Sequence, residues 1–163
     1  MILRIAKSLL VLSVGLFGLL VGIDNIIDYG TNFEFVRHVM SMDTTFPNNK
    51  LMWRAITSEP LHHLFYWGII AAELLTGTLC TAGAWKLYTA RWEPAGVFNA
   101  AKRLAIAGLV TGFLLWFFGF LVVGGEWFQM WQSQTWNGQE AAFRFIACIG
   151  LVLIFVTLED DEL

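Results

Sequence analysis

A single acidic residue interrupts one of the long apolar runs of this sequence. Glu73 is the only Asp, Glu, Lys or Arg within residues 61–84, with twelve residues of the run before it and eleven after it. If the run crosses a membrane, the carboxyl group lies near the middle, where an ionised carboxylate is costly unless it is paired or next to water. Glu73 is therefore a candidate proton or cation site. The alternative is a protonated side chain that hydrogen-bonds Thr76 or Thr78 on its own helix, or Thr111 on another.

A second group of polar residues flanks the same run. Asp24 and Asp28 are four residues apart, so they share a helix face if the first apolar run continues that far. His62 and His63 lie on the same side of the membrane. Carboxylate and imidazole groups are ligands for zinc, iron or manganese, and adjacent histidines point in different directions, so at most one is expected to join the aspartates. The alternative is a set of interfacial side chains that bond to the connector backbone.

Residues 124–145, GGEWFQMWQSQTWNGQEAAFRF, combine aromatic, amide and charged side chains in one connector. Glu126 and Arg144 come at the ends of neighbouring apolar runs, which predicts an ion pair at the outer membrane boundary, with a ligand-anion site as the alternative. Indole rings favour the headgroup region of a membrane. One more helical turn after the third run would place the first two tryptophans on one face. The predicted interfacial anchors are Trp127, Trp131 and Trp136.

Four apolar runs must position these residues. The chain is 57% hydrophobic and 14% charged, whereas soluble domains carry about a quarter charged residues. The runs are long enough, or nearly so, to cross about 30 Å of hydrocarbon as helices, which satisfy their own backbone groups. We therefore predict an all-α, four-transmembrane-helix bundle that forms a single integral membrane domain over residues 1–163. The predicted spans are residues 5–23, 61–84, 104–123 and 141–158.

The first connector, residues 24–60, is expected on the outer side and contains short amphipathic helices. Thr31 and Glu34 have the spacing of a capping box, which predicts a helix start there. Apolar residues then follow on one face: Phe33, Val36, Val39 and Met40. Small residues four apart also predict close helix packing. They are Gly18 and Gly22, Gly108 and Gly112, and the series Gly68, Ala72 and Thr76.

The basic residues predict the orientation of the bundle. With both termini inside, the inner side holds Arg4, Lys7, Lys86, Arg91, Lys102 and Arg103, and the outer side holds Arg37, Lys50 and Arg54. This excess favours cytoplasmic N- and C-termini. The net charge is −3 and the basic residues are scattered, so we expect no nucleic-acid partner. No nucleophile triad, Walker loop or dinucleotide-binding glycine pattern occurs in the sequence.

The outer segments carry a resemblance. The stretch GIDNIIDYGTNFEFVRHVMSMDTTFP, then WRAI, Glu73 and GEWFQMWQSQTWNGQEAAFRF resemble a bacterial family of predicted small integral membrane proteins that is catalogued as a domain of unknown function. The likeness extends over nearly the whole chain. It implies a four-span protein of the bacterial inner membrane, and it supplies no activity, cofactor or catalytic residue.

Three functional hypotheses follow. The first is a non-enzymatic accessory or scaffold subunit of an envelope or respiratory membrane complex, with the lipid bilayer and another membrane protein, or a second copy, as partners. The second is a small proton-coupled transporter or ion-conducting oligomer that uses Glu73. The third is a metal- or quinone-associated redox component that uses the aspartates and histidines of the outer side. Lipid contacts are expected, and a metal or quinone is left open.

Overall fold

The computed structural model of the protein describes residues 1–162, so Leu163, the last residue of the predicted domain, lies outside the described residues. The chain is 80% helix, with no strand among the described residues. In the described part of the chain, six α-helices and four 3-10 or π-helical segments, labelled α and η in chain order, make up the bundle and its connectors. In that order the elements are α1 (Ile2–Ile27), α2 (Tyr29–Ser41), η1 (Met52–Arg54), α3 (Glu59–Thr89), η2 (Ala90–Trp92), α4 (Ala95–Ala101), α5 (Arg103–Leu114), η3 (Leu115–Trp127), η4 (Met130–Gln132) and α6 (Gln139–Thr157).

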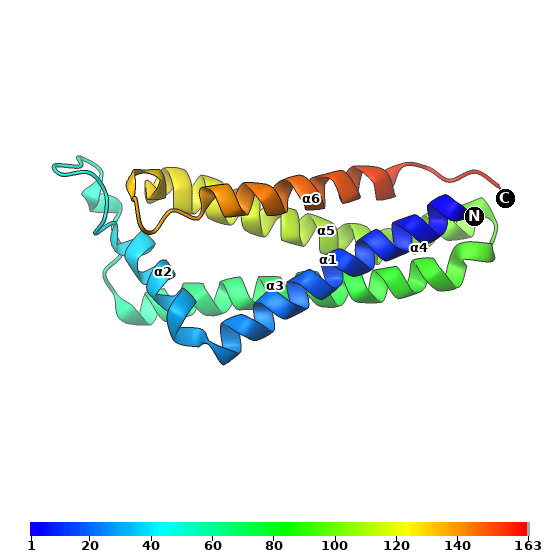
Figure 1. Cartoon of the computed structure of the whole chain (residues 1–163), viewed down its shortest axis with the longest axis horizontal. Helices are drawn as coiled ribbons and strands as arrows, with labels where there is room; N and C mark the ends of the chain where they lie inside the picture. Colours follow the sequence, from blue (N-terminus) through cyan, green and yellow to red (C-terminus); the bar gives the residue numbers. More distant parts are fainter. Residues whose placement is uncertain (163) are drawn as a thin grey trace.

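Four helical segments are long and apolar enough to cross a membrane, which confirms the predicted all-α four-transmembrane-helix bundle. They cover residues 2–27, 59–92, 95–127 and 139–157. The runs predicted at 5–23, 61–84 and 104–123 lie inside the first three, and the run predicted at 141–158 extends one residue beyond α6. Helices α1 and α3 form one side of the bundle and α5 and α6 the other, and both chain ends lie at the same end (Figure 1).

Glycine on both sides of the contact lets α1 and α3 approach closely. A Cβ atom added to Gly77 would lie 2.6 Å from the backbone nitrogen of Leu19, and one added to Gly18 would lie 2.9 Å from the backbone nitrogen of Gly77. Other predicted small residues also lie in close contacts: Gly22, Gly108 and Gly112. Gly68 does not, because nothing lies within 4 Å of its Cβ position. The packing residue on α3 is therefore Gly77 rather than Gly68.

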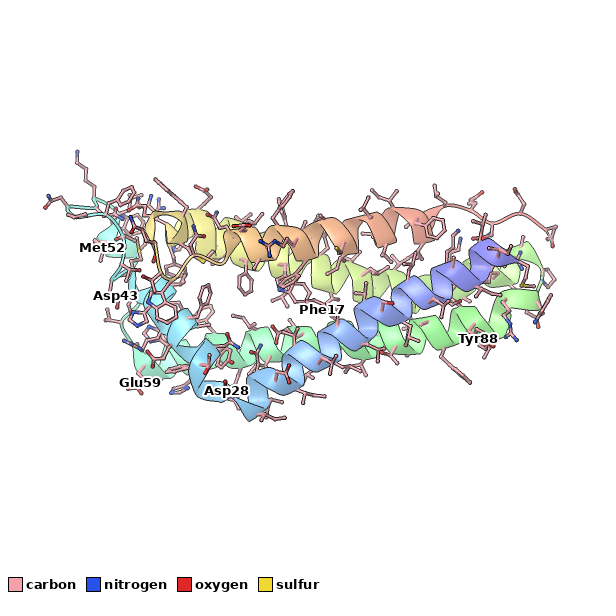
Figure 2. All side chains as sticks on the ribbon, viewed as in Figure 1. Phe17, Asp28, Asp43, Met52, Glu59 and Tyr88 are labelled. Carbon is pink, nitrogen blue, oxygen red and sulfur yellow. The ribbon has the colours of Figure 1, made fainter. Side chains whose placement is uncertain are left out.

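Helix α2 covers the end of the α1–α3 pair opposite the chain termini and confirms the predicted amphipathic helix (Figure 1). Phe33, Val36 and Met40 are buried and form an apolar cluster with Tyr66 and Ile70 of α3. Figure 2 shows this end of the molecule near Asp28, Asp43 and Glu59, opposite the end that carries Tyr88. The helix therefore closes the outer end of the bundle over α3.

The predicted capping box at Thr31 is wrong. Helix α2 begins at Tyr29, after a one-residue break at Asp28 (φ −108°, ψ 56°), so Thr31 is already inside the helix. Glu34 instead accepts hydrogen bonds from Arg37, one turn further on, at 2.9 Å from Nε. The Arg37 hydrogen bond and charge hold the pKa of Glu34 below its ordinary value. The break is one residue long because α2 turns back directly onto α3.

The outer half of the third span is a π-helix, η3, over Leu115–Trp127. Such helices are rare, are usually a single turn long and often occur at functional sites. The segment is richer in aromatic residues than the α-helix that precedes it. Trp116 packs against Phe17 of α1 and Phe145 of α6, with ring centroids 5.4 and 5.5 Å apart, whereas Phe117 and Phe118 are exposed. The π-helix therefore supplies one wall of the bundle interior.

Candidate functional site

Glu73 is buried inside the bundle and bonded to α1. Its side chain is 2% exposed, and Oε2 accepts a hydrogen bond from Nδ2 of Asn25 at 2.8 Å. Asn25 lies near the C-terminal end of α1. It reaches Glu73 because the glycines at the contact bring α1 and α3 close together. Between residues 1 and 162, Glu73 has no ion-pair partner. The carboxyl group is thus held by an amide rather than by a charge.

Asn25 connects Glu73 to two further polar groups. Its Oδ1 accepts a hydrogen bond from Nδ2 of Asn32 at 2.6 Å, and its backbone carbonyl accepts one from the hydroxyl of Tyr66 at 3.2 Å. Glu73, Asn25, Asn32 and Tyr66 are called the Glu73 centre below. Three elements contribute to it: α1, α2 and α3. The Asn25 side-chain amide accepts from Asn32 and donates to Glu73, so the arrangement is a directed chain that ends at the carboxyl group of Glu73.

The threonines expected to bond Glu73 do not reach it. Thr76 donates its hydroxyl to the carbonyl of Ala72 at 2.8 Å, and Thr111 donates to Ala107 at 2.9 Å. Thr78 likewise bonds a carbonyl of its own helix. These short side chains bond back to the preceding turn, as hydroxyls in helices commonly do. The carboxyl group therefore depends on Asn25, which sequence spacing does not reveal.

Glu73 lines a cavity of about 210 Å³. The cavity lies between the α1–α3 pair on one side and η3 and α6 on the other, with α2 over it. Asn25, Asn32 and Tyr66 also line it, and Trp116 and Phe120 form the opposite wall. A carboxyl group, two amides and a phenol thus line a partly open cavity large enough for a small ligand or several waters.

The predicted metal cluster is not assembled. His62 is buried and its Nε2 lies 2.7 Å from the carbonyl of Ile56. His63 lies 2.7 Å from the hydroxyl of Tyr29, while Asp24 and Asp28 are exposed. Among the described residues, no three His, Cys, Asp or Glu side chains come together as a metal site. The two histidines have different partners because successive helix positions point in different directions. His62 contacts the connector and His63 contacts α2.

The predicted ion pair between Glu126 and Arg144 is wrong. Arg144 instead pairs with Glu140, with Nη2 and Oε1 2.5 Å apart. Both side chains lie on the first turns of α6, where residues four apart are neighbours. Glu126 lies on η3 and is exposed. The pair within α6 is exposed as well, with side-chain exposures of 69% and 84%, so we expect little stabilisation from it.

The predicted tryptophan anchors have different surroundings. Trp127 and Trp131 are 46% and 44% exposed, but they do not continue one helix, because Gln129 adopts a left-handed conformation (φ 53°) that ends η3. Trp136 stacks on the ring of His38, with centroids 4.6 Å apart. The glutamines of this connector contact the first connector, residues 24–60. Nδ2 of Asn49 donates a hydrogen bond to Oε1 of Gln129 at 2.7 Å. Hydrogen bonds between side-chain amides therefore hold the two connectors together.

An exposed aromatic surface, called the outer platform below, results from this contact. The Arg54 guanidinium lies 4.6 Å from the ring centroid of Trp127 and 5.3 Å from that of Trp53. Phe46 meets Trp131 edge-on at 5.7 Å. The platform lies at the end of the molecule opposite the termini, next to Met52 (Figure 2). Its members are Phe46, Trp53, Arg54, Trp127 and Trp131.

A polar cluster at the other end was not anticipated from the sequence. Lys7 and Lys102 are 2% and 4% exposed, and their ammonium groups lie 2.5 and 2.7 Å from Oδ2 of Asp160. Arg4, also 2% exposed, donates to the carbonyls of Glu93 and Asp161 at 2.7 and 2.8 Å. These residues, Arg4, Lys7, Lys102 and Asp160, are called the tail clamp. They fix the C-terminal segment over the ends of α1 and α4.

The charges of the tail clamp determine how Asp160 titrates. Burial raises the pKa of Asp160, but hydrogen bonds from Lys102 and Lys7, together with their charges, lower it more, so that the pKa lies below its ordinary value of 3.8. Asp160 is therefore ionised at neutral pH and balances two buried cations. The acidic tail has a structural role at this end of the bundle.

Comparison with known proteins gives one match. The model of a family described as predicted small integral membrane proteins (DUF2165) matches residues 3–159. No curated protein and no solved structure matches the chain.

Proposed function

We propose that this chain, which belongs to the family of predicted small integral membrane proteins (DUF2165), is a non-enzymatic accessory subunit of an envelope or respiratory complex, and that it holds a ligand at the Glu73 centre. One observation carries the proposal: the buried carboxyl group lines a cavity of about 210 Å³ together with Asn25 and Asn32. A purely structural hydrogen-bonder requires no such space. The protein therefore keeps a polar binding surface inside an apolar bundle.

The proposed location is the bacterial inner membrane, with both termini in the cytoplasm. The end of the bundle that carries the termini also holds the larger set of basic residues, which is the pattern of cytoplasmic ends. Three of these residues, Arg4, Lys7 and Lys102, are bound in the tail clamp. In this orientation the Glu73 centre, near the α2 end of the bundle, opens toward the outer half of the membrane.

The outer platform supports the accessory role. It exposes aromatic rings at the end of the molecule, where Trp53 is 69% and Phe46 is 53% exposed. Hydrogen bonds between the connectors hold these rings in place. The backbone N–H of Phe46, for example, donates to the side-chain oxygen of Gln132 at 2.9 Å. Aromatic and arginine side chains on a rigid surface are the residues that dominate protein interfaces. We therefore assign the platform to a partner membrane protein.

Loss of the platform should release the partner. In the double variant Trp53→Ala and Trp127→Ala, we expect recovery of the copurifying membrane protein to fall by about tenfold or more, because interface anchors of this kind each contribute about 2 kcal/mol. The measurement is the stoichiometry of the partner in complexes purified from native membranes. Trp85→Ala is the matched control, since Trp85 is 67% exposed at the opposite end of α3. Equal recovery from the platform variant and the control would contradict the docking role.

The ligand role has its own test. Protein released from native membranes should carry a noncovalent small molecule that native mass spectrometry detects, with clearly lower occupancy in Glu73→Gln. The amide keeps the shape of the side chain but loses the charge that strengthens hydrogen bonds from a ligand. Glu59→Gln is the control, because the side chain of Glu59 is 75% exposed. A monodisperse wild-type protein without partner or bound molecule would overturn the proposed function.

The same observation also favours a second candidate, a proton-coupled transporter or ion-conducting oligomer. A carboxyl group in a cavity midway along a span is the arrangement that a proton or cation site needs. In proteoliposomes this candidate requires transport or conductance that Glu73→Gln abolishes while the protein stays folded. Equal flux in wild type and variant would remove the candidate and leave the accessory role.

A further inference from the structure

A second cavity lies against the one at the Glu73 centre. Its volume is about 260 Å³, and every residue that lines it is apolar. The two cavities share four lining residues, so they lie back to back within the outer half of the bundle. The shared residues are Phe35, Val36, Ile69 and Phe120. The first cavity is lined by the polar side chains of the Glu73 centre, and only apolar residues line the second.

The apolar cavity reaches the lipid-facing surface between α3 and η3. Phe65 of α3 and Phe118 of η3 both line it, and they are 48% and 57% exposed. An apolar chain can therefore enter from the bilayer without crossing the headgroup region. The dimensions and lining suit part of a hydrocarbon chain, which gains by burial against aromatic and aliphatic side chains. One polar and one apolar cavity side by side match the polar head and the apolar chain of an amphipathic ligand.

The polar cavity selects the headgroup. No Lys or Arg lines it, whereas Glu73 supplies an acidic group, so a phosphate-bearing headgroup would enter without a counter-charge. Oε2 of Glu73 accepts a hydrogen bond from Asn25. Its other oxygen, Oε1, makes no hydrogen bond with any residue that the structure describes. A hydroxyl donor can use this oxygen, and the Trp116 and Phe120 rings line the same cavity.

We propose that the two cavities form one binding site for a neutral lipid with a hydroxyl-bearing headgroup. The hydroxyl donates a hydrogen bond to the Glu73 carboxyl group, and the chain occupies the apolar cavity. Two kinds of membrane lipid have this chemistry: an isoprenoid quinol and a diacylglycerol. The inference rests on the proposed function, since it specifies the ligand of the same centre.

The test uses purified full-length protein in lipid nanodiscs, with binding followed by native mass spectrometry. The probes are decylubiquinol, dioctanoylglycerol and, as an anionic lipid with the same chains as the second, dioctanoylphosphatidylglycerol. We expect one molecule of quinol, diacylglycerol or both to bind, and the phosphatidylglycerol to bind at least about tenfold more weakly. Binding of the quinol alone assigns a ring-bearing head, and binding of the diacylglycerol alone assigns an ester-bearing one.

Two variants locate the binding site. Gly119→Leu should abolish binding by filling the apolar cavity, which Gly119 lines. The added Cβ has room, because its nearest neighbour lies 3.9 Å away. Gly68→Leu is the matched control, a glycine on the lipid-facing side with nothing within 4 Å. Glu73→Gln should weaken binding about tenfold, because one of the two carboxyl oxygens becomes an NH2 group that cannot accept a hydrogen bond from the lipid hydroxyl.

The outcomes separate the inference from the proposed function. Phosphatidylglycerol that binds as tightly as the neutral lipids, with dependence on Glu73, overturns the ligand class and leaves a ligand site at the centre. Unchanged binding in Gly119→Leu overturns the assignment of the chain to the apolar cavity. If no probe and no native lipid depends on Glu73, the ligand class and the ligand role of the Glu73 centre both fail, while the accessory role is decided separately by the test of the outer platform. Circular dichroism and gel filtration establish that each variant is folded.

Discussion

Gly77→Leu is expected to destabilise the bundle by about 3 kcal/mol, the upper part of the range for overpacked interiors. Its Cβ atom would lie 2.6 Å from the backbone nitrogen of Leu19, and the Leu19 side chain is as close, at 2.7 Å. Backbone on the facing helix cannot move aside as a flexible side chain can, so α1 and α3 must separate. Their separation also pulls Asn25 from Glu73, because these residues bond across the same pair of helices.

Thermal unfolding in mild detergent, followed by tryptophan fluorescence, measures this effect. The control is Gly68→Leu on the same helix, which adds the same side chain where nothing lies within 4 Å. Both substitutions remove a helix-interior glycine, so any gain in helix propensity is the same in the two variants. We expect the control to melt no lower than the wild-type protein. A Gly77→Leu protein as stable as Gly68→Leu would show that close approach of α1 and α3 does not hold the bundle together.

Asp160→Asn is expected to release the C-terminal segment and to cost about 3 kcal/mol, the lower end of the range for breaking a buried ion pair. The side chains of Asp160 and its partners Lys7 and Lys102 are all less than a tenth exposed. Removal of the carboxylate leaves two buried ammonium groups facing each other without compensation. Carbonyl groups such as that of Leu158, 2.6 Å from both ammonium groups, cannot replace the charge.

Limited proteolysis from the C-terminus and thermal unfolding measure the loss, with Glu159→Gln as the exposed neighbour that should behave as wild type. The pH dependence has a definite sign. Because the pKa of Asp160 in the folded protein is lowered from 3.8, its contribution is complete above that value and is lost as the pH falls through the lower, folded pKa. The variant should lack this acid-dependent step. Equal protection of the tail in wild type and Asp160→Asn would contradict the clamp.

The four spans could be predicted because long uncharged runs have few other structures available to them. The same reasoning predicted that Glu73 would be buried in the membrane domain. It could not identify Asn25 as the partner, because the two residues are 48 positions apart and meet only through the register of α1 on α3. That register depends on which glycine makes the contact, and sequence spacing alone could not distinguish Gly77 from Gly68.

Other features had no sequence signal or a misleading one. The π-helix η3 follows α5 within one uninterrupted apolar run, which carries no sequence signal for a π-helix, so the walls of both cavities could not be anticipated. Arg144 has Glu140 as a neighbour on its own helix, and this local pair formed in place of the longer-range pair with Glu126. The acidic tail carried no prediction, and its residue Asp160 binds two buried cations, Lys7 and Lys102. Ion pairs within one helix and the register of the helices against each other thus account for the differences between the sequence-based predictions and the structure.

The central claim is that the Glu73 carboxyl group is a binding group that a ligand reaches from the membrane. Modification by a hydrophobic carbodiimide, located by peptide mass spectrometry, tests it most directly. We predict that Glu73 is modified in delipidated protein and is protected in native membranes, while the exposed Glu59 reacts with water-soluble carbodiimide in both. A Glu73 that stays unmodified in delipidated, folded protein, or that reacts equally in both preparations, would contradict the claim.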